Sequence, residues 1–170
     1  METARLRLRR LHTRDASFIL RLVNDPDWLR YIGDRGVRTA ADAEHYIETG
    51  PIAMYARHGF GLFAVERKDV PGPIGMCGLL RRDILPDVDI GFAFLPEFRG
   101  VGYAAESAAA VLAWAREVVG VPRVVAITAP GNLRSQALLA KIGLHFEKNI
   151  RLPGEAEDVA LFGIDGKPES

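Results

Sequence analysis

Residues 99–104, with the sequence RGVGYA, place a basic side chain and two closely spaced glycines directly before an alanine-rich segment. A run of alternating apolar residues ends just before them, so this turn connects a predicted strand to a predicted helix. The first N–H groups of a helix have no partner within the helix and attract anions. Gly100 and Gly102 leave the backbone open to a diphosphate, and Ala104 keeps the first helical turn narrow. Arg99 is expected to add a positive charge.

Other interpretations of this turn are less favoured. A glycine pair can simply cap a helix, because short glycine motifs are weak signals of function. Residues 100–105 also match the dinucleotide pattern G-x-G-x-x-[GA], but that pattern needs an acidic residue about 20 positions later, where residues 126–129 read AITA. The pattern G-x-x-x-x-G-K-[ST] of nucleoside triphosphate sites does not occur in the sequence. A regulator that binds ATP or NAD is therefore the weaker alternative.

The first third of the chain predicts one strand followed by helices. Residues 5–11 (RLRLRRL) alternate leucine with arginine, which is typical of a half-buried strand. The helix after them is expected to have Thr13 as its cap. Residues 25–33 predict a short helix or an irregular segment, and residues 40–57 predict a longer helix that is shifted near Pro51.

The rest of the chain predicts strands around two more helices. Turn-rich segments separate three apolar runs and favour an antiparallel meander at residues 60–67, 73–82 and 88–95. A strong helix over residues 103–119 presents an apolar face to the sheet: Ala104, Ala108, Val111, Leu112, Ala115 and Val118. The last elements expected are a strand at 123–128, a helix at 132–143 that Gly143 stops, and strands at 144–150 and 158–164. Because one crossover helix makes a parallel step, the predicted fold class is α+β (mixed α/β) with one mixed sheet.

Composition narrows the range of partners. The 170 residues are expected to form a single domain over residues 1–170, with the last few residues disordered. The 22 basic and 22 acidic side chains give a formal net charge of zero, so no nucleic acid or membrane partner is expected. The sequence shows no apolar signal segment, and a cytoplasmic location is expected. Cys77, the only cysteine, is expected to be a small buried thiol, and no metal site is expected.

These segments resemble the GNAT superfamily of N-acetyltransferases, in particular the branch that includes ribosomal-protein N-terminal acetyltransferases. Arg99, Gly102 and Ala104 match the family signature [QR]-x-x-G-x-[GA] within the segment LPEFRGVGYAAES. Four other segments agree with the family in order and spacing: ARLRLRRLHTRDA, NDPDWLRYIG, PIGMCGL and NLRSQALLAKIGLHFE. The resemblance covers nearly the whole chain. It implies a mostly antiparallel sheet of about seven strands, flanked by helices and split between the fourth and fifth strands.

The resemblance implies that acetyl-CoA is the cosubstrate and lies in a V-shaped opening between residues 87–95 and residues 123–128. Its diphosphate is then expected on the glycine turn. Its pantetheine arm is expected to pair with the backbone at the end of the first of these strands, where a backbone N–H faces the thioester oxygen. The cofactor-binding residues implied in this way are Phe92, Phe94, Leu95, Arg99, Gly100, Val101, Gly102, Tyr103, Ala104, Asn132 and Ser135.

The reaction that the resemblance implies is direct attack of a neutral amine on the thioester. Asp89 stands where related sequences often have glutamate and is the candidate general base; alternatively it is an exposed aspartate on a polar strand face shared with Asp87. Asn132 is placed to cap the helix that follows, with Ser135 at the third helical position. In the family these two positions also contact CoA and lie near the leaving sulfur. Where many members carry a tyrosine general acid this chain has Leu139, which leaves Ser135 or solvent to protonate the thiolate.

The acceptor pocket is expected among residues 24–39. Trp28 and Tyr31 are the candidate substrate-binding residues, although Trp28 fits a core position equally well. Asp25 and Asp34 either attract an ammonium group or are turn residues. The predicted function is acetyl-CoA-dependent N-acetylation of a protein N-terminal α-amine or a small-molecule amine, by a monomer or a homodimer. The alternative is a catalytically idle CoA-binding or interaction domain.

Overall fold

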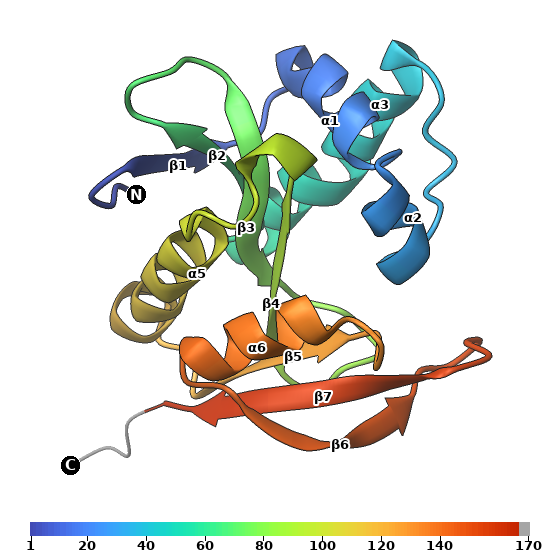
Figure 1. Ribbon diagram of the computed structural model, residues 1–170, viewed down its shortest axis with the longest axis vertical. Helices are drawn as coiled ribbons and strands as arrows, with labels where there is room; N and C mark the ends of the chain where they lie inside the picture. Colours follow the sequence, from blue (N-terminus) through green and yellow to red (C-terminus); the bar gives the residue numbers. More distant parts are fainter. Residues whose placement is uncertain (167–170) are drawn as a thin grey trace.

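Seven strands form one sheet in the computed structural model, which describes residues 1–166 (Figure 1). The strands are β1 (Leu6–Arg10), β2 (Leu62–Arg67), β3 (Pro73–Leu80), β4 (Val88–Phe94), β5 (Arg123–Thr128), β6 (His145–Arg151) and β7 (Asp158–Asp165). The sheet order is β1-β2-β3-β4-β5-β7-β6, and every neighbouring pair is antiparallel except β4 and β5. The predicted mixed, mostly antiparallel sheet is confirmed. The predicted disorder of the last few residues concerns residues 167–170, which lie outside the described residues.

Helices connect these strands on both sides of the sheet. Their bounds are α1 (Ala16–Leu22), α2 (Pro26–Tyr31), α3 (Ala40–Ile47), α4 (Ala53–His58), α5 (Tyr103–Trp114) and α6 (Leu133–Lys141). The wide turn η2 (Glu48–Ile52) joins α3 to α4 and contains Pro51, so the predicted shift near this proline is confirmed. No helix within residues 1–166 has both the length and the apolar composition needed to cross a lipid bilayer.

Two local predictions were wrong. Thr13 is not a cap, because it is the first residue of the short 3₁₀ turn η1 (Thr13–Asp15) and His12 precedes it at the cap position. Val118 does not belong to the buried face of α5 and is 70% exposed. The reason is the wide turn η4 (Ala115–Val119). In this turn the N–H of Gly120 bonds to the carbonyl of Ala115, five residues back, and the wider turn rotates the side chains after Ala115 away from the sheet.

The sheet is covered on its two faces by different helices. α5 lies on one side of β3 and β4, and the group α1–α3 lies on the other (Figure 1). Strand alternation sends Val88 and Ile90 into the cluster that contains the α5 residues, whereas Met76 packs with the α1–α3 residues. Each fully buried aliphatic side chain contributes about 1.5–3 kcal/mol, so these two clusters fix both faces of β4. Cys77 is a buried thiol, as predicted, and burial raises its pKa to about 12.

The parallel pair β4–β5 is joined over only two positions. Val88 is paired with Val124 and Asp89 with Val125, and no later residue of β4 is paired with β5. β4 continues to Phe94, so the edge that faces β5 is unpaired over most of its length. This confirms the predicted split between the fourth and fifth strands and leaves backbone groups of β4 open to an extended ligand.

Candidate active site

The glycine turn has the backbone geometry of an anion site. Gly100 and Gly102 have φ angles of +80° and +86°, which L side chains rarely adopt. Gly102 is the cap residue of α5 and offers no side-chain acceptor. The first helical bond runs from Glu106 N–H to the Gly102 carbonyl (3.0 Å), so the preceding N–H groups of α5 have no helical partner. A Cβ on Gly100 would meet no atom within 4 Å, so the side of the turn at this residue is open. These features fit a diphosphate.

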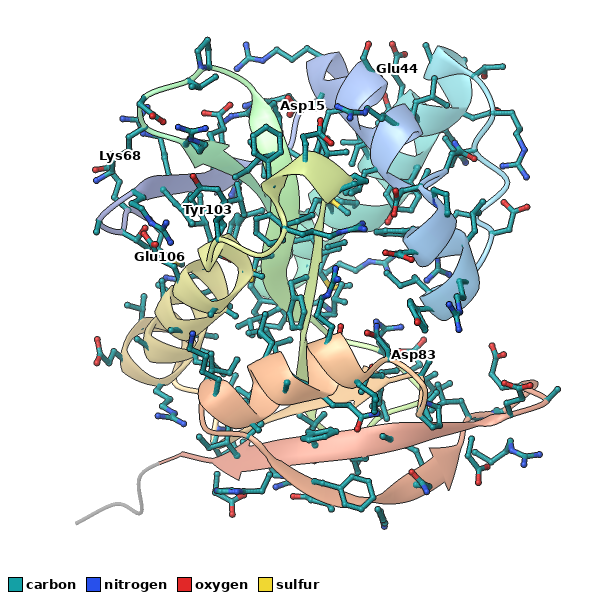
Figure 2. The ribbon with its side chains drawn as sticks, viewed as in Figure 1. Asp15, Glu44, Lys68, Asp83, Tyr103 and Glu106 are labelled. Atoms are coloured by element: carbon teal, nitrogen blue, oxygen red, sulfur yellow. The ribbon has the colours of Figure 1, made fainter. Side chains whose placement is uncertain are left out.

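A network from the N-terminal segment holds this turn in place. The Arg5 guanidinium donates to the Val101 carbonyl (3.0 Å) and to the Glu106 carboxylate (2.7 Å), and it lies 4.5 Å from the centre of the Tyr103 ring. The Thr3 hydroxyl donates to the same carboxylate (2.6 Å). Figure 2 shows Glu106 and Tyr103 at the start of α5, beside the β1 end of the sheet. Nothing in the sequence pattern connects these residues, because they are about a hundred positions apart.

Arg99 contacts protein carboxylates and does not point an unpaired charge at the turn. Its guanidinium donates to Asp25 (2.7 Å), to Asp27 (2.7 Å) and to the Phe94 carbonyl (3.0 Å). Arg99 therefore ties the start of α2 to the end of β4. The basic residues that line the groove without an ion pair to the described residues are Arg134 and Lys141 of α6.

A groove of about 1000 Å³ runs from the glycine turn past the start of α6. Nine of the predicted cofactor-binding residues line it: Phe92, Phe94, Arg99, Gly100, Gly102, Tyr103, Ala104, Asn132 and Ser135. The other two do not. Val101 is half-exposed on the turn, and Leu95 is buried in the α1–α3 cluster. The structure thus brings together most of the residues predicted for CoA from three separate parts of the chain.

A second cavity, called here the acceptor chamber, has a volume of about 290 Å³. It lies on the α1–α3 face of the sheet, where strand alternation aligns Leu62, Met76, Leu80, Asp89, Gly91 and Ala93. The chamber and the groove share wall residues, including Trp28, Tyr31, Phe92, Asn132 and Ser135. The two cavities therefore meet at the split between β4 and β5.

Asp89 is a buried member of the chamber wall. It is the last residue of β4 that is paired with β5, and it is 1% exposed. The alternative of an ordinary exposed aspartate is therefore wrong. Arg82 Nε lies 3.2 and 3.1 Å from the two carboxylate oxygens. Burial raises the pKa of Asp89 to about 6, and the positive charge of Arg82 acts against this rise. Roughly nine-tenths of this carboxyl is ionised at pH 7.

Asn132 and Ser135 serve as cap and cavity wall at the same time. The Asn132 side-chain oxygen accepts from the Ser135 backbone N–H (3.3 Å), which confirms the predicted cap. Both residues line the groove and the chamber, and the Ser135 hydroxyl makes no hydrogen bond to residues 1–166. Leu139 is buried in the chamber wall, so no phenol is present at that position.

The predicted acceptor residues divide into two groups. Trp28 and Tyr31 line both cavities, and Trp28 is also buried, with an indole N–H that finds no acceptor in the described chain. Asp25 accepts from the Asp27 N–H (3.2 Å) as the cap of α2, and Asp34 pairs with Arg38 at the surface. The structure therefore shows Asp25 and Asp34 as cap and turn residues outside the chamber wall.

Four other polar residues of the chamber were not predicted: Arg35, Tyr46, Arg82 and Thr128. They come from the loop after α2, from α3, from the segment after β3 and from the end of β5, and no local motif connects them. Within residues 1–166, no three His, Cys, Asp or Glu side chains are grouped to hold a metal ion.

The model of a family described as an acetyltransferase (GNAT) domain matches residues 5–145. The chain belongs to the GNAT acetyltransferase family. A Bacillus subtilis protein named YkkB, described as uncharacterized, is 30% identical over 152 residues, which cover 88% of this chain and 87% of that protein. The uncharacterized N-acetyltransferase YoaA of the same organism is 27% identical, over 89% of this chain and 85% of its own.

Solved structures of GNAT proteins share the fold at lower identity. An acetyltransferase from Agrobacterium tumefaciens has a TM-score of 0.81 at 24% identity, over 96% of this chain and 92% of its own. The ribosomal-protein-S5-alanine acetyltransferase of Vibrio fischeri has a TM-score of 0.80 at 18% identity, over 98% and 96%. The spermidine N-acetyltransferase of Vibrio cholerae, solved with CoA and spermine, has a TM-score of 0.78 at 19% identity, over 96% of both chains. The match to the family model makes this chain a GNAT acetyltransferase, and this family uses acetyl-CoA.

Proposed function

We propose that this acetyltransferase moves the acetyl group directly from acetyl-CoA to a primary amine, either a protein N-terminal α-amine or a small-molecule amine. The observation that carries the proposal is the position of Asp89, a buried carboxylate in the acceptor chamber at the point where β4 and β5 separate. A donor in the groove and an amine in the chamber would meet next to it. We place this reaction in the cytoplasm.

Proton transfer shows why the environment of Asp89 suits an amine acceptor. An α-amine with a pKa near 8 is about one-tenth neutral at pH 7, so its deprotonation costs about 1.4 kcal/mol. Deprotonation of a lysine side chain costs about 4.6 kcal/mol at the same pH. Transfer from the α-ammonium to a carboxylate of pKa about 6 is uphill by about 2.7 kcal/mol. A carboxylate at its ordinary pKa near 4 would raise this figure to roughly 5.5 kcal/mol. Burial thus makes Asp89 a better base.

The proposed donor contacts follow from the groove. The N–H groups at the start of α5 bind the diphosphate, Arg134 and Lys141 add positive charge nearby, and the unpaired edge of β4 pairs with the pantetheine arm. Ser135, whose hydroxyl makes no hydrogen bond to residues 1–166, is the candidate on this chain to give a proton to the departing thiolate, and solvent is the alternative.

The test is acetyl transfer by the pure protein. Incubation with acetyl-CoA, a panel of primary amines and a thiol reagent should give CoA release that depends on the amine, with the acetylated amine detected by mass spectrometry. A reaction without amine measures background thioester hydrolysis. Tight CoA binding without amine-dependent release across a broad panel would contradict the proposal and favour a catalytically idle CoA-binding domain.

A further inference from the structure

The acceptor chamber carries more positive than negative charge. Arg35 and Arg82 both line it, and Asp89 is its only carboxylate within the part of the chain that the structure describes. Asp89 is already paired with Arg82 (3.1 Å), so Arg35 has no carboxylate partner in the chamber. In the adjoining groove, Asp27 is paired with Arg99. The chamber therefore has no unpaired carboxylate to attract a second positive charge on an acceptor.

Several hydrogen-bond donors of the chamber have no acceptor in the described chain. Arg82 reaches Asp89 through Nε, and its two terminal nitrogens make no hydrogen bond to residues 1–166. The Arg35 guanidinium and the Tyr46 hydroxyl likewise have no acceptor in this part of the protein. Burial raises the pKa of Tyr46, and the positive charges of Arg35 and Arg82 act against that rise. Arg35, Arg82 and Tyr46 all belong to the wall of the same chamber.

These donors have the chemistry of a carboxylate site. A planar guanidinium binds both oxygens of a carboxylate, and a tyrosine hydroxyl adds a further donor. The nitrogens of Arg82 belong to one rigid group that already touches Asp89. A carboxylate on its terminal nitrogens would therefore lie only a few bonds from an amine at Asp89. The volume of about 290 Å³ suits a small molecule or the first residue of a peptide.

We infer that the acceptor amine carries a carboxylate a few bonds away, as an amino acid does, and that Arg35, Arg82 and Tyr46 bind this carboxylate. The inference rests on the proposed function and names the acceptor class. The acceptor ammonium first loses a proton to Asp89, and the neutral nitrogen then forms a bond to the acetyl carbon as the C–S bond breaks. The second amine proton passes to the CoA thiolate, and the proton on Asp89 returns to solvent, giving an N-acetylated acid and CoA.

Matched acceptors test the inference through kcat/KM. Alanine and glycine are compared with alaninamide and glycinamide, together with spermidine and a short peptide with an N-terminal aspartate. We expect Arg35→Gln to lower kcat/KM for the carboxylate acceptors by roughly 10- to 100-fold, mainly through KM, with little change for the amides. Because each acceptor is compared between wild type and variant, differences in amine pKa cancel. Arg57→Gln is the control, since Arg57 is exposed on α4 and lies outside the chamber wall.

Binding measurements separate this inference from the proposed function. With CoA present, the wild-type protein should bind N-acetylalanine roughly tenfold more tightly than N-acetylalaninamide, and Arg35→Gln should remove the difference. Acetylation of amides or spermidine as efficiently as amino acids, together with equal binding of the two products, would overturn the inference and leave the proposed function intact. Carboxylate-dependent binding without acetylation of any amine would support the anion site and contradict the proposed function. If the wild-type protein prefers the peptide with an N-terminal aspartate to the free amino acids, the inference is supported, and the carboxylate that the chamber binds is the side chain of an acidic N-terminal residue.

Discussion

Replacing Gly102 with valine is expected to weaken CoA binding by roughly a hundredfold, because the loss of two charge-assisted hydrogen bonds of about 1.5–3 kcal/mol each removes at least that much affinity. Gly102 caps α5 with a φ angle of +86°, and a Cβ there would lie 3.3 Å from an Arg5 nitrogen. A β-branched residue is strained in this conformation by about 1–2 kcal/mol, so the turn is expected to relax and misdirect the first N–H groups of α5. Isothermal titration with CoA measures the effect.

The matched control for this substitution is Gly120→Val. Gly120 has a φ angle of +77° at the far end of the same helical segment, and a Cβ there meets no atom within 4 Å. It carries the same backbone strain but lies outside the groove, so this variant should lose stability and keep its CoA affinity. A folded Gly102→Val protein that binds CoA as tightly as wild type would refute the proposed diphosphate site.

Replacing Asp89 with asparagine is expected to lower kcat by roughly 10²- to 10⁴-fold while CoA affinity is unchanged, because a positioned general base contributes about that much. Asparagine has nearly the same size as the aspartate that lies beside Arg82 in the wild-type protein. Burial raises the pKa of Asp89 to about 6, so the base is protonated and inactive below this pH. The wild-type kcat/KM should therefore rise with pH through about 6, and the Asn variant should lack this step.

Asp87→Asn is the matched control, since Asp87 lies two residues earlier, pairs with Arg123 and stands outside the chamber wall.

The free energy of unfolding, measured against pH, separates a loss of catalysis from a loss of folding in the Asp89→Asn variant. The native state holds the Asp89 proton up to a pH of about 6 and the unfolded chain only up to about 4, so the native state binds more protons within this range. Wild-type stability should therefore fall by about 3 kcal/mol as pH rises through this window, and Asp89→Asn should avoid this loss. Wild-type turnover by the Asn variant would remove Asp89 from the mechanism.

Local patterns were sufficient to predict the strands, the helices and their order. Alternation in the segments that became β1 and β4, helical spacing in α5 and the break at Pro51 depend on near neighbours, so the sequence displays them directly. The glycine turn was predictable for the same reason, because its backbone conformation depends on two glycines separated by a single residue. The exposure of Val118 was not predictable, because the wide turn η4 shifts the helical register in a segment with no proline or glycine to mark it.

The tertiary environment of the site residues was not predictable from local patterns. Arg99 was expected to face a diphosphate, but two carboxylates more than seventy positions earlier surround its guanidinium. The burial of Asp89 depends on the helices that cover one face of β4, and alternation alone makes it a polar-face residue. Arg35, Tyr46 and Arg82 converge on the chamber only through the packing of three elements. The chamber and the partners of Arg99 therefore required the structure, whereas the conformation of the glycine turn did not.

The most direct measurement is a crystal structure of this protein with bound CoA. We expect the diphosphate to accept hydrogen bonds from the N–H groups around Gly102 at the start of α5, and the thiol end to lie between β4 and β5 beside Asp89. An empty turn, with the coenzyme bound at another place on the protein, would contradict the account.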